Sequence, residues 1–195
     1  MPKAGSALSS SIWTDSEGLW DGRGAPFRKV GVVAERANMK KRRSQDTADD
    51  IGLVRLDAEI HRCFPLMREL RPQVRESEFL KTVRRLEKGG FRLAYVIEHD
   101  DVKAVAGFRV TENLDNGRFM YVDDLVTKPD ERSKGYGQRL FDWLIDYAGA
   151  HGCGALTLDS GVQRFDAHRF YLRNRMRISS HHFWLAVAGE RGHVA

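Results

Sequence analysis

The chain has 195 residues, of which 42% are hydrophobic, and this suits one globular domain with an appendage. The formal net charge of +5 comes from the first 45 residues, which hold nine Lys and Arg against four Asp and Glu; the rest of the chain holds 23 of each. A folded part without net charge argues against a nucleic-acid-binding surface, and no apolar run approaches the ~18 residues that a membrane span needs.

The two cysteines, Cys63 and Cys153, fit neither a disulfide framework nor a metal site. The first residues also lack the apolar segment of a signal peptide. Both features predict a cytoplasmic protein that works in a reducing compartment and holds no metal.

Residues 1–50 differ in composition from the rest. Gly, Ser, Ala and charged residues dominate and the apolar residues follow no sustained period, so we expect a basic, disordered extension. The run Lys40–Arg43 is typical of a solvated linker, with an address signal or a nucleic-acid patch as the alternative. Met39 lies directly before this run, which raises the hypothesis that residues 1–38 derive from a start codon assigned too far upstream. A peptide of the natural protein that covers Trp13 would contradict that hypothesis.

From Ile51 onward, apolar residues recur with the periods of helices and strands, which predicts a folded domain over residues 51–188 and a tail over 189–195. Pro65 lies inside the first helical pattern and predicts a kink or two short helices. The expected elements, in chain order, are a strand at Ile51–Leu56, helices from Asp57 to Leu70 and from Glu76 or Ser77 to Leu86, strands at Phe91–Glu98, Val102–Thr111 and Arg118–Thr127, a helix from Tyr136 to Ala150, a strand at Ala155–Asp159, a helix at Phe165–Arg173 and a strand at Ile178–Val187.

Short connections between the three strands from residue 91 to residue 127 predict an antiparallel meander. The strand at 155–159 follows a helical crossover, so we expect it to lie parallel to the strand at 118–127. The order β-α-α-β-β-β-α-β-α-β predicts an α+β fold of three layers, with a mixed, mostly antiparallel sheet and helices on both faces.

The segment between the third meander strand and the next helix has the features of an anion cradle. Its sequence is Arg132-Ser133-Lys134-Gly135-Tyr136-Gly137. The first N–H groups of a helix have no helical partner, and the helix dipole favours negative charge beside them. Gly135 and Gly137 allow a bulky group to approach the backbone, while Arg132 and Lys134 add positive charge. We therefore expect a phosphorylated ligand here; a plain glycine-containing turn is the alternative.

This order of elements, with this cradle, resembles the GNAT superfamily of N-acetyltransferases. The acyl-CoA signature of the family, Gln/Arg-x-x-Gly-x-Gly/Ala, is matched by Arg132–Gly137. Upstream, Leu125–Pro129 resembles the Leu-x-Val-x-Pro pattern with slightly different spacing, and downstream, Ala167–Tyr171 resembles the Ala-x-x-(Phe/Leu)-Tyr helix. The resemblance covers the whole predicted domain. The chain departs from the pattern at Arg164, where many members have Asn, and at Arg175-Met176, where Gly-Phe is usual.

The resemblance implies that acetyl-CoA is the acyl donor and co-substrate. Its pyrophosphate would bind backbone N–H groups of the cradle, and Arg132 would shape the loop or contact phosphate. The pantetheine arm would pair with the backbone of Leu125 and Thr127 like an added strand, and the N–H of Leu125 or Val126 would polarise the thioester carbonyl. The implied cofactor-binding residues of the cradle are Arg132, Ser133, Lys134, Gly135, Tyr136, Gly137 and Gln138.

Tyr171 is the main catalytic candidate, since transfer to an amine expels a CoA thiolate that a phenol within reach could protonate. A tyrosine packed into the core is the alternative. A lysine-type amine, with a pKa of ~10.4, is neutral only to ~1 part in 10³ at pH 7, so a base is useful. Asp123 and Asp124 are the candidates on oppositely facing positions of one strand, and Asp123 is preferred because it shares a face with Leu125. Binding of substrate charge or pairing with nearby arginines is the alternative role, and the histidines at 181–182 are weaker candidates.

These features predict an enzyme, an acyl-CoA N-acyltransferase that moves acetyl to a primary amine by direct attack in a ternary complex. The alternative is a non-catalytic protein of GNAT fold that binds acyl-CoA as a sensor or as a complex subunit. The acceptor would be a small-molecule or peptide amine: acidic residues near Asp123 suit a cationic amine, whereas arginines between residues 164 and 177 suit an anionic one. We expect no membrane partner, and the last strand could pair across a homodimer.

Overall fold

The computed structural model of this chain describes residues 50–187, all within one compact unit. The predicted disordered extension, the basic run Lys40–Arg43, the alternative start at Met39 and the tail at 189–195 lie outside the described residues. None of the described helices is long and apolar enough to cross a membrane. The cytoplasmic location remains a prediction.

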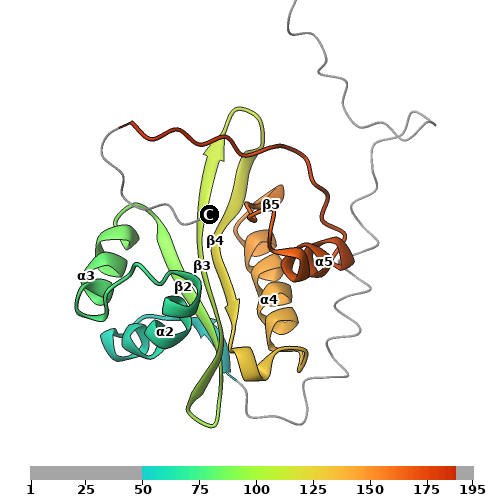
Figure 1. The fold of residues 1–195 in the computed structure, drawn as a ribbon. Coiled ribbons are helices and arrows are strands. Elements are labelled where there is room, and N and C mark those ends of the chain that lie inside the picture. The colour runs from blue at the N-terminus through green and yellow to red at the C-terminus, as the bar shows by residue number, and fades with distance from the viewer. Residues whose placement is uncertain (1–49, 188–195) are drawn as a thin grey trace, which may run out of the picture. The chain divides into compact units, whose positions relative to one another are not determined.

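A five-stranded sheet forms the centre of the fold, and its strands follow one another in space as they do in sequence. The strands from β1 to β4 pair antiparallel, and β5 pairs parallel to β4 after a helical crossover. The predicted meander and the predicted parallel strand are therefore confirmed. The strands are β1 (Asp50–Leu53), β2 (Phe91–Glu98), β3 (Asp101–Asn113), β4 (Gly117–Thr127) and β5 (Ala155–Leu158) (Figure 1).

Helices lie on both faces of this sheet, as predicted. In Figure 1, α2 and α3 lie on one side of the strands, and α4 lies on the other side with α5 next to it. Pro65 lies inside α2, which runs on as one helix rather than two. The helices are α2 (Asp57–Leu70), α3 (Glu76–Glu87), the short 3-10 helix η1 (Pro129–Glu131), α4 (Tyr136–Ala150) and α5 (Phe165–Arg173).

Each face of the sheet has its own hydrophobic core, because successive strand side chains point to opposite faces. On the α2–α3 side, Phe91 of β2 packs in one cluster with Ile60 of α2. On the α4 side, Phe108 of β3 packs with Leu140 of α4, and neither side chain is exposed to solvent. The two cores hold β3 and β4 between them as a rigid platform.

The ladder between β3 and β4 contains a β-bulge. Gly107 pairs with Asp124, but the next residue of β3, Phe108, pairs with Val122. Asp123 is therefore the extra residue of β4 and has no partner on β3. A bulge of this kind interrupts the alternation of side chains between the two faces of the sheet.

The predicted strand at Ile178–Val187 is wrong: residues 174–187 contain no helix or strand. The apolar side chains that suggested it, Phe183, Leu185 and Val187, are 90%, 83% and 93% exposed. An alternating pattern indicates that a segment suits a sheet, but a strand forms only where a neighbouring strand takes up its backbone hydrogen bonds. Among residues 50–187 the segment has no such neighbour.

Candidate active site

The pairing of β4 with β5 ends in the middle of β4. Only Phe119 to Val122 of β4 pair with β5, whereas β4 itself continues to Thr127. From Asp123 onward, the outer edge of β4 therefore has no strand beside it within residues 50–187. We call residues 123–127 the open edge of β4.

Backbone groups of two residues face the open edge. The N–H of Lys128 donates to the carbonyl of Lys103 on the β3 side at 2.9 Å. Backbone groups of successive strand residues point to alternate sides, so those of Val126 also face β3, whereas those of Leu125 and Thr127 face outward. The open edge thus offers donors and acceptors at two positions, as an extended ligand requires for pairing like a strand.

The predicted cradle follows directly after the open edge. Ser133 and Gly135 have φ angles of 64° and 96°, and Gly135 is the N-cap residue of α4. The first helical bond of α4 is donated by the N–H of Arg139 to the carbonyl of Gly135 at 2.9 Å, so the N–H groups before Arg139 have no acceptor within the helix. Backbone N–H groups in such a turn, at a helix N-terminus, form a concave site for an anion.

Gly137 allows the start of α4 to lie close to the open edge. A Cβ atom at this position would lie 2.7 Å from Oγ1 of Thr127. Glycine is therefore favoured here by the close approach of the helix to the Thr127 side chain rather than by its backbone angles. This glycine therefore lets the predicted cradle lie directly beside the open edge of β4.

The two basic residues of the cradle, Lys134 and Arg132, differ in whether they are ion-paired. Lys134 forms an ion pair with Glu131 at 2.7 Å, and Glu131 also binds Lys103 at 2.9 Å. The guanidinium of Arg132 has no partner among the described residues. Arg132 is therefore the better candidate for direct contact with a phosphate.

Two further cradle residues fasten α4 through their side chains. The phenol of Tyr136 donates to Glu98 at 2.5 Å, and this bond, with burial, raises the pKa of Tyr136 to about 12. The side chain of Gln138 exchanges hydrogen bonds with that of Asn174, which directly follows α5, at 2.6 and 3.0 Å. Both contacts fix the helix start without using its backbone N–H groups.

Asp123 and Asp124 were predicted to face opposite sides of the sheet. This prediction is wrong. Asp123 forms two hydrogen bonds of 3.0 Å with Arg109, whose guanidinium lies over the ring of Phe91 on the α2–α3 side. Asp124 lies on the same side, bound to Nε of Arg71 at 2.7 Å. The bulge brings both side chains to one face, so Asp123 does not share a face with Leu125 as the alternation predicted.

Arg71 connects the end of α2 to the bulge. It is the C-cap residue of α2, and besides its bond to Asp124 it donates to the backbone carbonyl of Asp123 at 3.0 Å. The side chain of Asp124 is only 10% exposed, whereas that of Asp123 is 23% exposed. Burial raises the pKa of Asp124, and the nearby Arg71 opposes this effect without cancelling it.

We expect Asp124→Asn to change how stability depends on pH. Because its pKa is raised by burial, the folded protein binds the Asp124 proton more tightly than the unfolded chain does. The contribution of this group to stability is therefore complete at low pH and is lost as the pH rises through the raised pKa. The free energy of unfolding of the wild type, measured by urea denaturation, should fall relative to that of Asp124→Asn as the pH rises above ~4. A difference that stays constant from acid to neutral pH would contradict this expectation.

The sequence did not point to a further polar cluster, which lies where the pairing of β4 with β5 ends. Tyr121, two residues before the bulge, donates to Asp159 at 2.6 Å, and Nδ1 of His182 lies 3.1 Å from the same carboxylate. Burial, followed by the bond to Asp159, raises the pKa of Tyr121. No motif predicts this contact, because it depends on the parallel pairing that brings the end of β5 beside β4.

The candidate general acid, Tyr171, lies on α5. Its ring centroid is 6.4 Å from that of Phe141 on α4 and 5.6 Å from that of Phe170. Burial raises the pKa of its phenol, so the hydroxyl keeps its proton at neutral pH. Among the described residues, this hydroxyl has no hydrogen-bond partner. The packing of the ring is thus structural, while the hydroxyl is left available.

Neither cysteine has the environment of a nucleophile. Cys63 is fully buried, and burial raises its pKa to about 12. Burial also raises the pKa of Cys153, which lies in the turn after α4. A raised pKa leaves little thiolate at neutral pH, so acetyl transfer through a cysteine is not supported.

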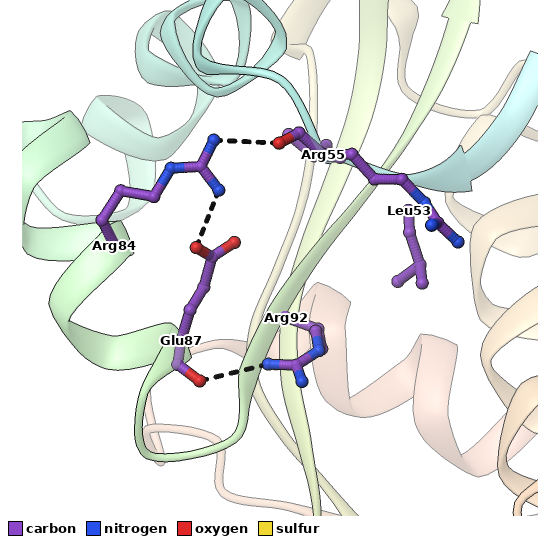
Figure 2. Close-up of a pocket in the computed structure, with 6 residues that line it drawn as sticks. Leu53, Arg55, Arg84, Glu87 and Arg92 are labelled. Carbon is purple, nitrogen blue, oxygen red and sulfur yellow. Dashed lines mark hydrogen bonds and ion pairs between the residues drawn. The ribbon is translucent and has the colours of Figure 1, made fainter.

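A hollow of about 390 Å³ lies at the other edge of the sheet and is separate from these residues. Figure 2 shows Arg84 donating to Glu87 and to the backbone carbonyl of Arg55, and Arg92 donating to the backbone carbonyl of Glu87. These contacts join the end of β1, α3 and the start of β2. The hollow therefore reflects how the β1 edge is held together and adds nothing to the candidate site.

The sequence model of the acetyltransferase (GNAT) family matches residues 54–175, which include the open edge of β4, the cradle and Tyr171. The chain belongs to this family of acyl-CoA-dependent N-acetyltransferases, which use acetyl-CoA. The predicted family, fold class, enzyme class and co-substrate are confirmed.

The proteins to which this chain is similar are named for different amine acceptors, or for none. An uncharacterized N-acetyltransferase of Bacillus subtilis (strain 168), YhdJ, is 36% identical over 109 residues, which are 55% of this chain and 77% of the relative. An aminoalkylphosphonate N-acetyltransferase of Salmonella typhimurium is 33% identical over 66 residues, 34% of this chain and 43% of that protein. The structure of aminoglycoside N-acetyltransferase AAC(6')-Iy in complex with CoA has a TM-score of 0.65 at 12% identity, over 76% of this chain and 99% of that one.

Proposed function

We propose that this protein transfers the acetyl group of acetyl-CoA to a primary amine by direct attack of the amine on the thioester. The observation that carries the proposal is the open edge of β4, with the backbone of Leu125 and Thr127 facing it, directly before the cradle. An extended pantetheine arm suits a strand edge, and the pyrophosphate to which it is attached suits a helix N-terminus.

The donor half of the site would be made mostly of backbone. The N–H groups from Ser133 to Gln138 would bind the pyrophosphate, and Arg132 would add the free positive charge. Of the two N–H groups considered for the thioester carbonyl, that of Leu125 faces the open edge, whereas that of Val126 faces β3. We therefore assign the oxyanion role to Leu125.

The acceptor would reach the thioester from the α2–α3 face, where Asp123 and Asp124 lie. The cradle and Tyr171 belong to α4 and α5 on the other side (Figure 1), so donor and acceptor can be bound together. Asp123 is the more exposed carboxylate and is assigned the contact with the amine; Asp124, buried against Arg71, holds the bulge in shape. Holding both reactants in line supplies much of the rate enhancement.

The proposed reaction forms a C–N bond, breaks the C–S bond of the thioester and protonates the CoA thiolate. The neutral amine nitrogen attacks the carbonyl carbon, the C–S bond breaks, and the thiolate takes a proton from Tyr171. Tyr171 regains a proton released by the new amide nitrogen through water. No covalent enzyme intermediate is required, in agreement with the raised pKa values of both cysteines.

The test is a thiol-release assay with acetyl-CoA against a panel of amines. The panel should contain an aminoalkylphosphonate and an aminoglycoside, after the names of the relatives, together with a polyamine and a lysine peptide. We expect CoA release that depends on one class of amine, with an equal amount of N-acetyl product and no acetylated protein by mass spectrometry. Acetyl-CoA binding without turnover of any amine would favour the non-catalytic sensor instead.

A further inference from the structure

The polar cluster where the β4–β5 pairing ends contains a histidine that is oriented by a carboxylate. Nδ1 of His182 lies 3.1 Å from Oδ2 of Asp159, the residue directly after β5. Because a carboxylate accepts hydrogen bonds and does not donate them, we assign the proton of the neutral imidazole to Nδ1, which leaves a lone pair on Nε2. Tyr121 donates to the same carboxylate oxygen at 2.6 Å and holds it in place. The imidazole is therefore arranged to accept a proton at Nε2.

This cluster lies on the face of the sheet from which the acceptor would approach. Val122 of β4 and Leu158 of β5 pair with each other and pack into the core on the α4 side. The residues next to them in sequence, Tyr121 and Asp159, therefore point to the α2–α3 side. Asp123, to which the contact with the amine is assigned, lies on that side as well. The imidazole and the carboxylate thus belong to one polar surface.

The open edge of β4 begins beside this cluster. Asp123 and Asp159 are the first residues after the last β4–β5 pair, so they stand where the two strands separate. Leu125, whose N–H is assigned to the thioester carbonyl, follows two residues later, about 7 Å along the strand. An amine bound by Asp123 would therefore lie between the imidazole and the thioester carbon.

The two carboxylates of the bulge are less suited than the imidazole to remove a proton from the amine. Both oxygens of Asp123 accept hydrogen bonds of 3.0 Å from Arg109, and Asp124 is turned toward Arg71 with only 10% of its side chain exposed. A general base is most effective when its pKa lies near the working pH. Imidazoles ordinarily titrate at about 6.5, whereas aspartate side chains titrate at about 3.9.

We propose that His182 is the general base for the acceptor amine and that Asp159 and Tyr121 position it; this inference rests on the proposed acetyl transfer to an amine. Nε2 takes one proton from the bound ammonium group, which leaves the neutral amine that attacks the thioester carbon. The imidazolium then releases this proton to solvent, to which the 59% exposed side chain of His182 has access. The second proton leaves the new amide nitrogen and reaches Tyr171 through water.

The first test is the pH dependence of kcat/KM for an accepted amine, in the wild type and in His182→Asn. The amide of Asn can still donate to Asp159, but it takes up no proton at neutral pH. We expect at least a tenfold lower kcat/KM at about pH 7, since general base catalysis contributes typically 10²–10⁴-fold. The loss should shrink as the pH rises toward the pKa of the amine, ~10.4 for a lysine-type amine, because the amine then loses its proton without help.

The change of charge in the neutral range is expected from the imidazole, because the other charged or titratable groups on this face are paired with one another. These groups are Tyr121 with Asp159, Arg109 with Asp123, and Arg71 with Asp124. A contact that merely fastens the segment after α5 would give a loss that is the same at every pH. Such a loss, or one smaller than twofold, would overturn the proposal.

The matched control is His61→Asn, which changes an exposed histidine of α2 outside the site and should keep kcat/KM within twofold of the wild type. A loss in His181→Asn in place of His182→Asn would also contradict the assignment. Nitrogen-15 NMR of the imidazole rings supplies a readout that needs no substrate. At about pH 8, His182 should carry its proton on Nδ1 in the wild type and should become a mixture of tautomers in Asp159→Asn. A wild-type proton on Nε2 would overturn the proposal.

Failure of this inference can be told apart from failure of the proposed function. If the wild type releases no CoA with any amine of the panel, acetyl transfer and the role of His182 are both overturned. If the wild type is active and His182→Asn is equally active at about pH 7, only the role of His182 is overturned.

Discussion

Tyr171→Phe is expected to lower kcat at least tenfold while leaving the Kd for CoA almost unchanged. The substitution removes only the hydroxyl, so the ring contacts with Phe141 and Phe170 remain. Without a proton donor the expelled thiolate must leave as an anion, and general acid catalysis of this kind contributes typically 10²–10⁴-fold. Steady-state kinetics with an accepted amine and calorimetric titration with CoA measure the two quantities.

The control for this prediction is Tyr147→Phe. Tyr147 lies on α4, where its ring packs against Phe108 and stacks on His151, and it has no part in the proposed site. Its loss of a hydroxyl should leave kcat within twofold of the wild type. Equal activity of Tyr171→Phe and Tyr147→Phe would mean that Tyr171 is a packing residue, the alternative considered from the sequence.

Gly107→Ala is expected to destabilise the fold by about 1–3 kcal/mol, the usual cost of forcing an extra carbon into a packed region. A Cβ here would lie 2.6 Å from Cζ of Phe91 and 2.8 Å from Oδ2 of Asp124. Phe91 is 3% exposed and cannot swing out without opening the α2–α3 core. Asp124 cannot move without lengthening its bond to Arg71, so activity should fall together with stability.

Gly52→Ala in β1 is the matched control, because a Cβ there would meet nothing within 4 Å. Urea denaturation should place this variant within ~0.5 kcal/mol of the wild type. The double variant Gly107→Ala/Phe91→Leu should recover part of the loss caused by Gly107→Ala, since the shorter side chain lacks the clashing ring atom. A fully stable Gly107→Ala would show that the bulge tolerates side chains at this position.

The sequence predicted the parts of the fold that depend on local patterns. Hydrophobic periodicity and turn chemistry located α2, α3, α4, α5 and the five strands of the sheet, although not the short helix η1, and the order of elements indicated the parallel β4–β5 pair. The turn and helix start at Gly135 and Gly137 were also predictable, since Gly135 adopts a positive φ and Gly137 lies close to Thr127; anion binding there stays a prediction. These features depend on residues that are close together in the sequence.

What the sequence could not predict depends on contacts between distant segments. The bulge at Asp123 is a mismatch between two strands, and neither strand reveals it alone. Because of the bulge, Asp123 and Asp124 lie on one face and each binds an arginine. The predicted reason for preferring Asp123, a face shared with Leu125, therefore does not hold. The strand predicted at Ile178–Val187 did not form for a related reason: a strand needs a partner strand, and none of residues 50–187 pairs with this segment.

The open edge of β4 has a consequence for how this family can diversify. Leu125 and Thr127 would hold the donor through main-chain atoms, which every residue except proline supplies, so their side chains can drift without loss of that function. Acceptor contacts, in contrast, would be made by side chains such as that of Asp123, and single substitutions can redirect them. Such a division would let an inherited donor site persist while the acceptors diverge.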